Sequence, residues 1–150
     1  MISTQTSVQR TTDHGRRTTG DPPIIFFDGV CGLCNWFVDF VMPRDRRPTF
    51  RFAPLQGETA REYLSAGEVS ALKTVVLVDE TGSYRQSTAV LRVLRGLGGS
   101  WPPVAAVLSV ISTPLRDIGY RLLAQNRYRF FGKKEACRMP TAEERERFLP

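Results

Sequence analysis

The stretch "FFDGVCGLCN", residues 26–35, sets two cysteines three positions apart behind an aspartate. It completes the apolar run "PPIIFF", which is typical of a short strand buried on both faces. Apolar side chains then recur at helical spacing as far as Val41, and Pro43 stops the pattern. The stretch therefore predicts a strand, a tight turn at Asp28 and a helix with Cys31 at its N-terminus.

The next segments predict the partners of this first strand. "TFRFA", residues 49–53, alternates in polarity, so the first unit closes as strand, helix, strand, with parallel strands and a right-handed crossover. Residues 58–66 predict a short helix ended by Gly67. "TVVLVD", residues 74–79, predicts a strand that "SYRQ" joins in a hairpin, and Ser87 is expected to cap the helix that follows.

The last third of the chain predicts helices only. Two helices are expected, over 104–112 and 115–125. The capping box of Thr141 and Glu144 predicts a short final helix. The apolar stretch "VAAVLSVI", which begins at Val104, indicates a buried helix. Its alternative is a surface that docks on a membrane or a partner.

The order strand, helix, strand, helix, strand, strand, helix is that of a thioredoxin-type layout. The sequence therefore predicts one α/β, thioredoxin-like domain over residues 21–150, with a helical C-terminal extension. Residues 1–20 lack apolar periodicity and predict a disordered tail. With 150 residues, of which 41% are hydrophobic, the chain can bury a core of its own.

Cysteine count and hydropathy indicate the compartment. Three cysteines are too few for the disulfide framework of a secreted protein, so the C-x-x-C points to redox or metal chemistry in a reducing setting. No stretch approaches the roughly 18 apolar residues of a membrane-spanning helix, and the N-terminal segment lacks the apolar run of a secretory signal. A cytoplasmic location is predicted.

The net charge of +6 favours anionic surroundings. Residues 116–138 carry seven Lys or Arg interleaved with aromatic side chains, a composition that can bind nucleic acid or a membrane surface. The favoured interpretation is a helix and turn whose basic residues face water while the aromatic rings pack inward. No nucleic-acid partner is then expected, and peripheral membrane association is the alternative.

The spacing of the cysteines favours reversible disulfide chemistry. The Cα atoms of residues three apart on a helix are about 5 to 6 Å from each other, within the range that a disulfide bridges. The helix N-terminus would stabilise a thiolate at Cys31, which is the form that attacks disulfides. Cys34 is expected to be the less exposed of the two and to resolve the mixed disulfide.

Two other uses of the pair are weighed against this one. The cysteines could be inert buried thiols, but their place directly after a buried strand and a glycine turn argues against chance. A structural zinc site needs four ligands, and only Cys137 and His14 remain as ordinary candidates. With a single histidine, Cys-His hydrolase chemistry lacks a base. Because neither G-x-x-x-x-G-K-[ST] nor G-x-G-x-x-G occurs, no cofactor is predicted.

Asp28 has two possible roles before this helix. As an N-cap it would accept a backbone N–H from the first helical turn. As an ionisable neighbour of the dithiol it would pass protons during exchange, while its charge would oppose thiolate formation. The role of Cys137 stays open.

These residues resemble a family. "FFDGVCGLCN", "FRFAPLQ", "VVLVDETGSYRQSTAVLRVL", "NRYRFFG" and a final C-x-x-P are similar to the DCC family of thiol-disulfide oxidoreductases, from Ile24 to the C-terminus. The resemblance implies a thioredoxin-like fold and assigns Asp28, Cys31 and Cys34 to the D-x-x-C-x-x-C motif. It also marks Cys137 and Pro140 as family features.

The chain departs from thioredoxins proper in one respect. They carry a cis-proline immediately before the third strand, beside the dithiol, whereas "GEVSALKTVVLV" has no proline. The prediction is a thiol-disulfide oxidoreductase that acts through Cys31 and Cys34 on a protein or low-molecular-weight disulfide or thiol. The alternative is a non-catalytic thioredoxin-like interaction module or a metal-binding one.

Overall fold

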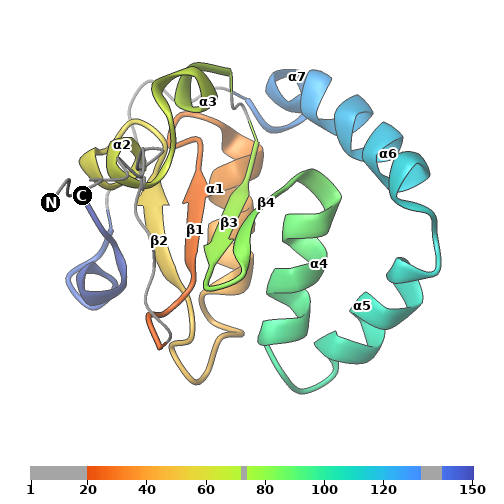
Figure 1. Ribbon diagram of the computed structural model, residues 1–150, viewed down its shortest axis with the longest axis horizontal. Helices are drawn as coiled ribbons and strands as arrows, with labels where there is room; N and C mark the ends of the chain where they lie inside the picture. The colour runs from red at the N-terminus through yellow and green to blue at the C-terminus, as the bar shows by residue number, and fades with distance from the viewer. Residues whose placement is uncertain (1–19, 72–73, 133–139) are drawn as a thin grey trace, which may run out of the picture.

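The computed structural model describes residues 20–71, 74–132 and 140–150. Its sheet has the order β2-β1-β3-β4 (Figure 1). The strands are β1 (Ile24–Phe27), β2 (Arg51–Pro54), β3 (Val76–Asp79) and β4 (Gly82–Arg85). β1 and β2 are parallel, and β3 runs antiparallel to both β1 and β4. The predicted parallel unit and the hairpin are therefore both present.

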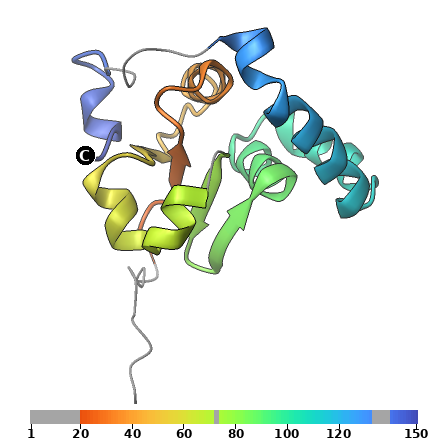
Figure 2. The ribbon, with the colours of Figure 1, turned by 90° about the horizontal axis from the view of Figure 1, so that it is seen from above.

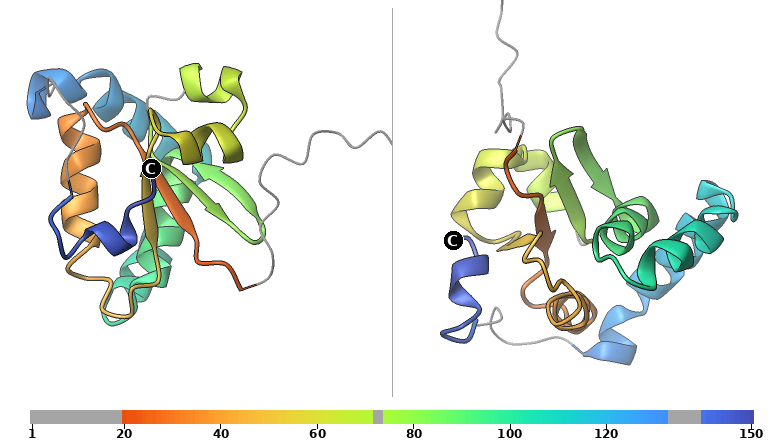
Figure 3. Two further views of the ribbon diagram at one scale, coloured as in Figure 1. Left: turned by 90° about the vertical axis from the view of Figure 1, so that its left-hand side faces the viewer. Right: turned by 90° about the horizontal axis from the view of Figure 1, so that it is seen from below.

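The apolar run of β1 is buried on both sides of the sheet because helices cover both faces. Ile25 and Phe27 face one hydrophobic cluster, and Ile24 and Phe26 face the other. Figures 2 and 3 show the two helical layers. The first cluster lies under α1 (Gly32–Val41) and α4 (Gln86–Gly96), and the second lies under α2 (Glu58–Tyr63) and α3 (Ala66–Ala71).

The C-terminal helices form an outer arc beyond α4 and α1 (Figure 1). They are α5 (Trp101–Ser109), α6 (Thr113–Gln125) and α7 (Arg127–Phe131). The chain then returns to β2, where a 3-10 helix (Arg145–Arg147) precedes Phe148. The Phe148 ring stacks on Phe52 with centroids 5.6 Å apart, and the Leu149 N–H donates to the Phe52 carbonyl at 2.8 Å. The predicted capping box is also present, since Thr141 and Glu144 exchange hydrogen bonds of 3.0 and 3.4 Å.

This topology confirms the thioredoxin-like α/β fold, but two local predictions were wrong. The helix expected over 58–66 is two short helices, and Gly67 lies inside the second of them rather than ending the first. Ser87 does not cap α4. Arg85 is the N-cap residue, and the Ser87 hydroxyl donates to the Asp117 carboxylate on α6 instead.

The largest departure from prediction concerns the outer helices. "VAAVLSVI" was expected to be buried, yet Ala105 is the buried residue of α5 and Val107 is 70% exposed. Phe130 on α7 is also 70% exposed, so its ring does not pack inward as predicted. Tyr120, in contrast, is turned inward and its hydroxyl bonds to Thr74.

Within the described ranges, no helix combines the length and apolarity required to cross a membrane. The predicted tail, residues 1–20, falls outside the described residues except for Gly20, as do His14 and Cys137.

Candidate functional site: the dithiol at the start of α1

The two motif cysteines lie at the junction between the central strand β1 and helix α1. Cys31 is the N-cap residue of α1, in extended conformation, and its N–H donates to the Asp28 carbonyl at 3.1 Å. Cys34 follows within the first helical turn, and both are reduced thiols. Because a helix start leaves backbone N–H groups unpaired, this position supports a negatively charged sulfur at Cys31.

Both thiols are buried. Cys31 has 0% of its surface exposed and Cys34 3%, so the prediction that Cys31 is the more exposed cysteine was wrong. The end of α7 lies against the start of α1, where the Gly32 N–H donates to the Gly132 carbonyl at 3.2 Å. The C-terminal extension therefore closes over the helix terminus that the sequence places at the site.

The Cys34 thiol is a weaker acid than an ordinary cysteine. The pKa of the Cys34 thiol is raised far above its ordinary value, chiefly by its hydrogen bond with the Cys31 side chain and next by burial. The negative charges of Cys31 and Asp28 act in the same direction, whereas a backbone hydrogen bond with Asp28 lowers this pKa. A negative charge on Cys31 therefore favours the protonated form of Cys34.

Asp28 is buried and tied into the turn before α1. Its Oδ1 accepts hydrogen bonds from the Gln56 side-chain amide at 2.8 Å and from the Val30 N–H at 3.2 Å. Gln56 Oε1 in turn accepts the Gly29 N–H at 3.2 Å. Because the N-cap residue of α1 is Cys31, Asp28 stabilises this turn rather than capping the helix. Its charge does reach the dithiol, as the pKa of Cys34 shows.

Asn35 is a site residue that the sequence reasoning did not single out. Its buried Nδ2 donates to the Gly29 carbonyl at 2.9 Å and to the Cys31 carbonyl at 2.8 Å, so one amide holds both ends of the turn. Its Oδ1 has no hydrogen-bond partner among the described residues. The available signal was an amide side chain directly after the second cysteine.

Tyr120 and Thr74 were also missed, because α6 and the entry to β3 meet only in the folded chain. The Tyr120 hydroxyl lies 2.5 Å from Thr74 Oγ1 and accepts the Val75 N–H at 3.3 Å. Burial raises the pKa of Tyr120, and the charges of Cys34 and Cys31 add to that shift. Tyr120 is therefore within electrostatic reach of the dithiol.

This contact occupies the place where thioredoxins carry their cis-proline. A proline has no N–H to donate, whereas Val75 does, and Tyr120 accepts it. The entry to β3 is thus fixed by a side chain from the C-terminal extension instead of by a proline ring.

The described residues contain no group of three or more Cys, His, Asp or Glu side chains placed to hold a metal ion. Cys137 and His14, the two additional ligands considered from the sequence, lie outside those residues.

A β2-β1-β3-β4 sheet with a C-x-x-C at the start of the helix after its central strand defines a thioredoxin-like dithiol protein. Residues 25–133 match the model of the DCC1-like thiol-disulfide oxidoreductase family, and the chain belongs to that family.

Two curated relatives support the assignment. The Bacillus subtilis protein named uncharacterized protein YuxK is 36% identical over 129 residues, which cover 85% of this chain and 93% of YuxK. A DCC family protein of Arabidopsis thaliana, described as chloroplastic, is 38% identical over 119 residues, which cover 78% of this chain and 69% of the plant protein. No solved structure matches the chain.

Proposed function

We propose that this protein is a thiol-disulfide oxidoreductase in which Cys31 is the attacking cysteine and Cys34 the resolving one. The observation that carries the proposal is the raised pKa of the Cys34 thiol next to a cysteine, Cys31, at a helix N-terminus. Cys34 is held protonated by its neighbour and by burial, while Cys31 lies at a helix N-terminus that favours a thiolate. Family membership agrees with this chemistry.

The reaction consists of two exchanges. The Cys31 thiolate attacks one sulfur of a substrate disulfide, forming a mixed disulfide and releasing the other substrate sulfur as a thiolate that takes up a proton. Cys34 then loses its proton and attacks the Cys31 sulfur, which releases the second substrate thiol. The substrate disulfide is reduced to two thiols and the Cys31-Cys34 pair is oxidised. A low-molecular-weight dithiol or two monothiols return the pair to its reduced state.

The timing follows from what raises the pKa of Cys34. Its largest cause is the hydrogen bond with the Cys31 sulfur, and Cys31 loses its charge once it is bonded to the substrate. The pKa of Cys34 therefore falls only after the mixed disulfide forms. Asp28, whose charge reaches Cys34, accepts the proton at that point, because the turn hydrogen bonds hold its carboxylate in place.

A buried attacking sulfur requires the site to open before a substrate can reach it. The start of α1 and the end of α7 must separate, since the Gly132 carbonyl accepts a hydrogen bond from the Gly32 N–H beside the cysteine. Opening also frees the Gly32 N–H to stabilise the Cys31 thiolate. Substrates are protein or low-molecular-weight disulfides in a reducing compartment such as the cytoplasm.

Trapping of a mixed disulfide tests the proposal. With glutathione disulfide as substrate, Cys34→Ser should accumulate a stable glutathione adduct on Cys31, observed by mass spectrometry of the intact protein. Cys31→Ser should form none, and the parent protein should turn over the disulfide when a thiol reductant is supplied. Equal trapping by both variants, or by neither, contradicts the assigned roles.

The rival function is a metal-binding or interaction module without turnover. Elemental analysis of freshly purified reduced protein distinguishes it. Stoichiometric zinc that protects both cysteines from alkylation, together with absent disulfide reduction, would favour the rival.

A further inference from the structure

Helix α6 is oriented with its polar side inward. Asp117 accepts a hydrogen bond from Ser87 on α4, and Tyr120 reaches the entry to β3, so these polar residues face the domain. Leu115, Ile118 and Leu122, spaced for one helical face, point to solvent and are 53% to 60% exposed. An amphipathic helix normally buries its apolar stripe, whereas among the described residues this stripe is left exposed.

The preceding helix exposes apolar side chains as well. Val107 on α5 and the two residues after the helix, Val110 and Ile111, are 41% to 85% exposed. We define the α5–α6 apolar surface by these six side chains: Val107, Val110, Ile111, Leu115, Ile118 and Leu122. Exposed apolar side chains gathered over two adjacent helices mark an interaction site, whereas scattered ones do not.

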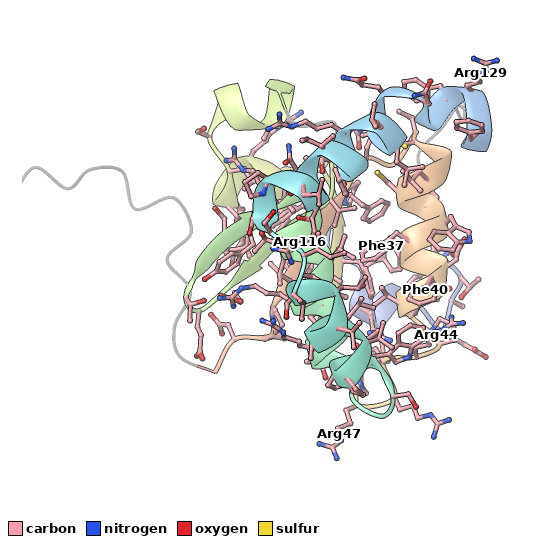
Figure 4. The ribbon with its side chains drawn as sticks, turned by 90° about the vertical axis from the view of Figure 1, so that its right-hand side faces the viewer. Phe37, Phe40, Arg44, Arg47, Arg116 and Arg129 are labelled. Carbon is pink, nitrogen blue, oxygen red and sulfur yellow. The ribbon has the colours of Figure 1, made fainter. Side chains whose placement is uncertain are left out.

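The ends of this surface are basic. Figure 4, which faces α5 and α6, shows Arg129 extending outward beside α7 at one end and Arg47 extending outward beyond α5 at the other. Both arginines are exposed. Between Ser100 and Leu115 the sequence has no ionisable side chain, and the Asp117 carboxylate is turned toward Ser87. This side of the molecule therefore combines exposed apolar side chains with arginines, Arg47 and Arg129 at its ends and Arg116 on α6 between them (Figure 4).

We propose that the α5–α6 apolar surface binds the surface of an anionic lipid bilayer. Interfacial helices bury an apolar stripe at the boundary between lipid headgroups and acyl chains while arginines contact the acidic headgroups. The arrangement of Arg47, Arg116 and Arg129 around the apolar side chains has the charge complementarity that such a bilayer requires. Helices α5 and α6 follow one another along the outer arc of the fold, and both pack on α4 (Figure 1).

Other occupants fit less well. A second copy of the chain would bring two net charges of +6 together, with the exposed arginines at the seam. An extended polypeptide is usually held in a groove or at a sheet edge, and this surface is the outer side of two helices. The segment before Gly20 contains only three large apolar residues, Met1, Ile2 and Val8, so its composition does not match a six-residue apolar surface.

Vesicle flotation tests the proposal with the full-length reduced protein. Vesicles of phosphatidylcholine mixed with phosphatidylglycerol should bind the protein at least tenfold more tightly than phosphatidylcholine vesicles do, and high salt should reduce the difference. Replacing two exposed apolar side chains, Ile118→Gln with Leu122→Gln, should lower binding at least tenfold. Circular dichroism should be unchanged, because neither residue is buried.

A matched pair of arginine variants tests the charge arrangement. Arg129→Gln should weaken binding to the anionic vesicles, whereas Arg61→Gln, which removes the same charge from an exposed position on α2, should not. Equal loss in both variants would mean attraction by net charge alone and would overturn the assignment of this surface.

Two further outcomes also overturn it. One is binding that Ile118→Gln with Leu122→Gln leaves unchanged. The other is a dimer in analytical ultracentrifugation that those substitutions dissociate, since the surface would then belong to a second copy. The proposal does not rest on the redox function, so Cys31→Ser should bind vesicles as the parent protein does.

Discussion

The backbone N–H of Gly32 donates to the carbonyl of Gly132, at 3.2 Å, and so joins the first turn of α1 to the end of α7. This N–H is one of the groups that a helix start leaves unpaired and that would otherwise stabilise a thiolate at Cys31. The contact thus couples two properties of the site: the access of a substrate to Cys31 and the acidity of its thiol.

Gly132→Ala should loosen this contact. Gly132 has a φ of +74° and a ψ of 168°, a conformation that strains any residue with a Cβ by about 1–3 kcal/mol. Nothing lies within 4 Å of the added methyl group, so the strain acts on the backbone alone. We expect Cys31 to react faster with iodoacetamide at pH 7 in this variant, measured by mass spectrometry.

Two controls separate this effect from general destabilisation. Gly99→Ala introduces comparable strain at a φ of +62°, away from the dithiol, and Gly119→Ala adds a methyl group on α6 in open space. Neither should alter the alkylation rate of Cys31 under native conditions. Faster alkylation in Gly99→Ala as well would show that global unfolding exposes the thiol, and the closure assigned to α7 would be wrong.

Asp28 can be tested with two substitutions that differ in charge and in hydrogen bonding. Asp28→Asn keeps an oxygen for the Gln56 and Val30 donors but removes the charge, and Asp28→Ala removes both. If the carboxylate takes the Cys34 proton, both variants should slow resolution of the mixed disulfide. Asp28→Ala alone should lose stability, by about 1–3 kcal/mol, because buried donors lose their acceptor.

Stopped-flow release of the second substrate thiol, with denaturant unfolding of the same proteins, provides the measurement. Normal resolution in Asp28→Asn would restrict Asp28 to holding the turn. Since the charge of Asp28 raises the pKa of Cys34, its removal should also lower that pKa.

Tyr120→Phe should weaken the junction between α6 and β3. The change leaves the Val75 N–H and the Thr74 hydroxyl without their shared partner, which costs about 1–3 kcal/mol for buried groups. We expect a lower free energy of unfolding and slower disulfide reduction. Tyr84→Phe removes the same hydroxyl from an exposed hydrogen bond with Thr81 and should change stability by less than about 0.5 kcal/mol. Equal effects of the two variants would exclude a positioning role for Tyr120.

The stability of the reduced protein should fall in alkaline solution. The folded state raises the pKa of Cys34 above its usual value of 9.0, so above about pH 9 the unfolded chain releases a proton that the folded chain retains. The stability linked to Cys34 is fully present below that pH and is lost as the pH rises, at about 1.4 kcal/mol per pH unit for one proton. Tyr120 adds a loss of the same sign above about pH 10.

Urea unfolding between pH 7 and 10.5, under reducing conditions, measures this decline. Cys34→Ala should flatten it from about pH 9 upward, and Tyr120→Phe only above about pH 10. An identical pH dependence in the parent protein and in Cys34→Ala would contradict the protonated state assigned to Cys34.

The amino-acid sequence determined the inner part of this protein. The apolar run ending at Phe27, the glycine turn and the helical spacing up to Val41 dictate strand, turn and helix, because their periods depend on local backbone geometry. The D-x-x-C-x-x-C spacing then places Cys31 at the helix start in any fold that contains this unit. The parallel pairing of β1 with β2 also followed, since a short helical crossover allows little else.

The tertiary structure alone decided what surrounds the dithiol. That α7 meets α1, and that Tyr120 reaches Val75, depends on contacts between segments far apart in the sequence, which local periodicity does not encode. The same limit explains the wrong prediction for α5. A run of apolar residues indicates that a helix favours an apolar contact, but it does not indicate whether another part of the chain packs against that helix. Here the polar side of α6 is held inward because Asp117 accepts a hydrogen bond from Ser87 and Tyr120 shares one with Thr74, so the apolar side faces out.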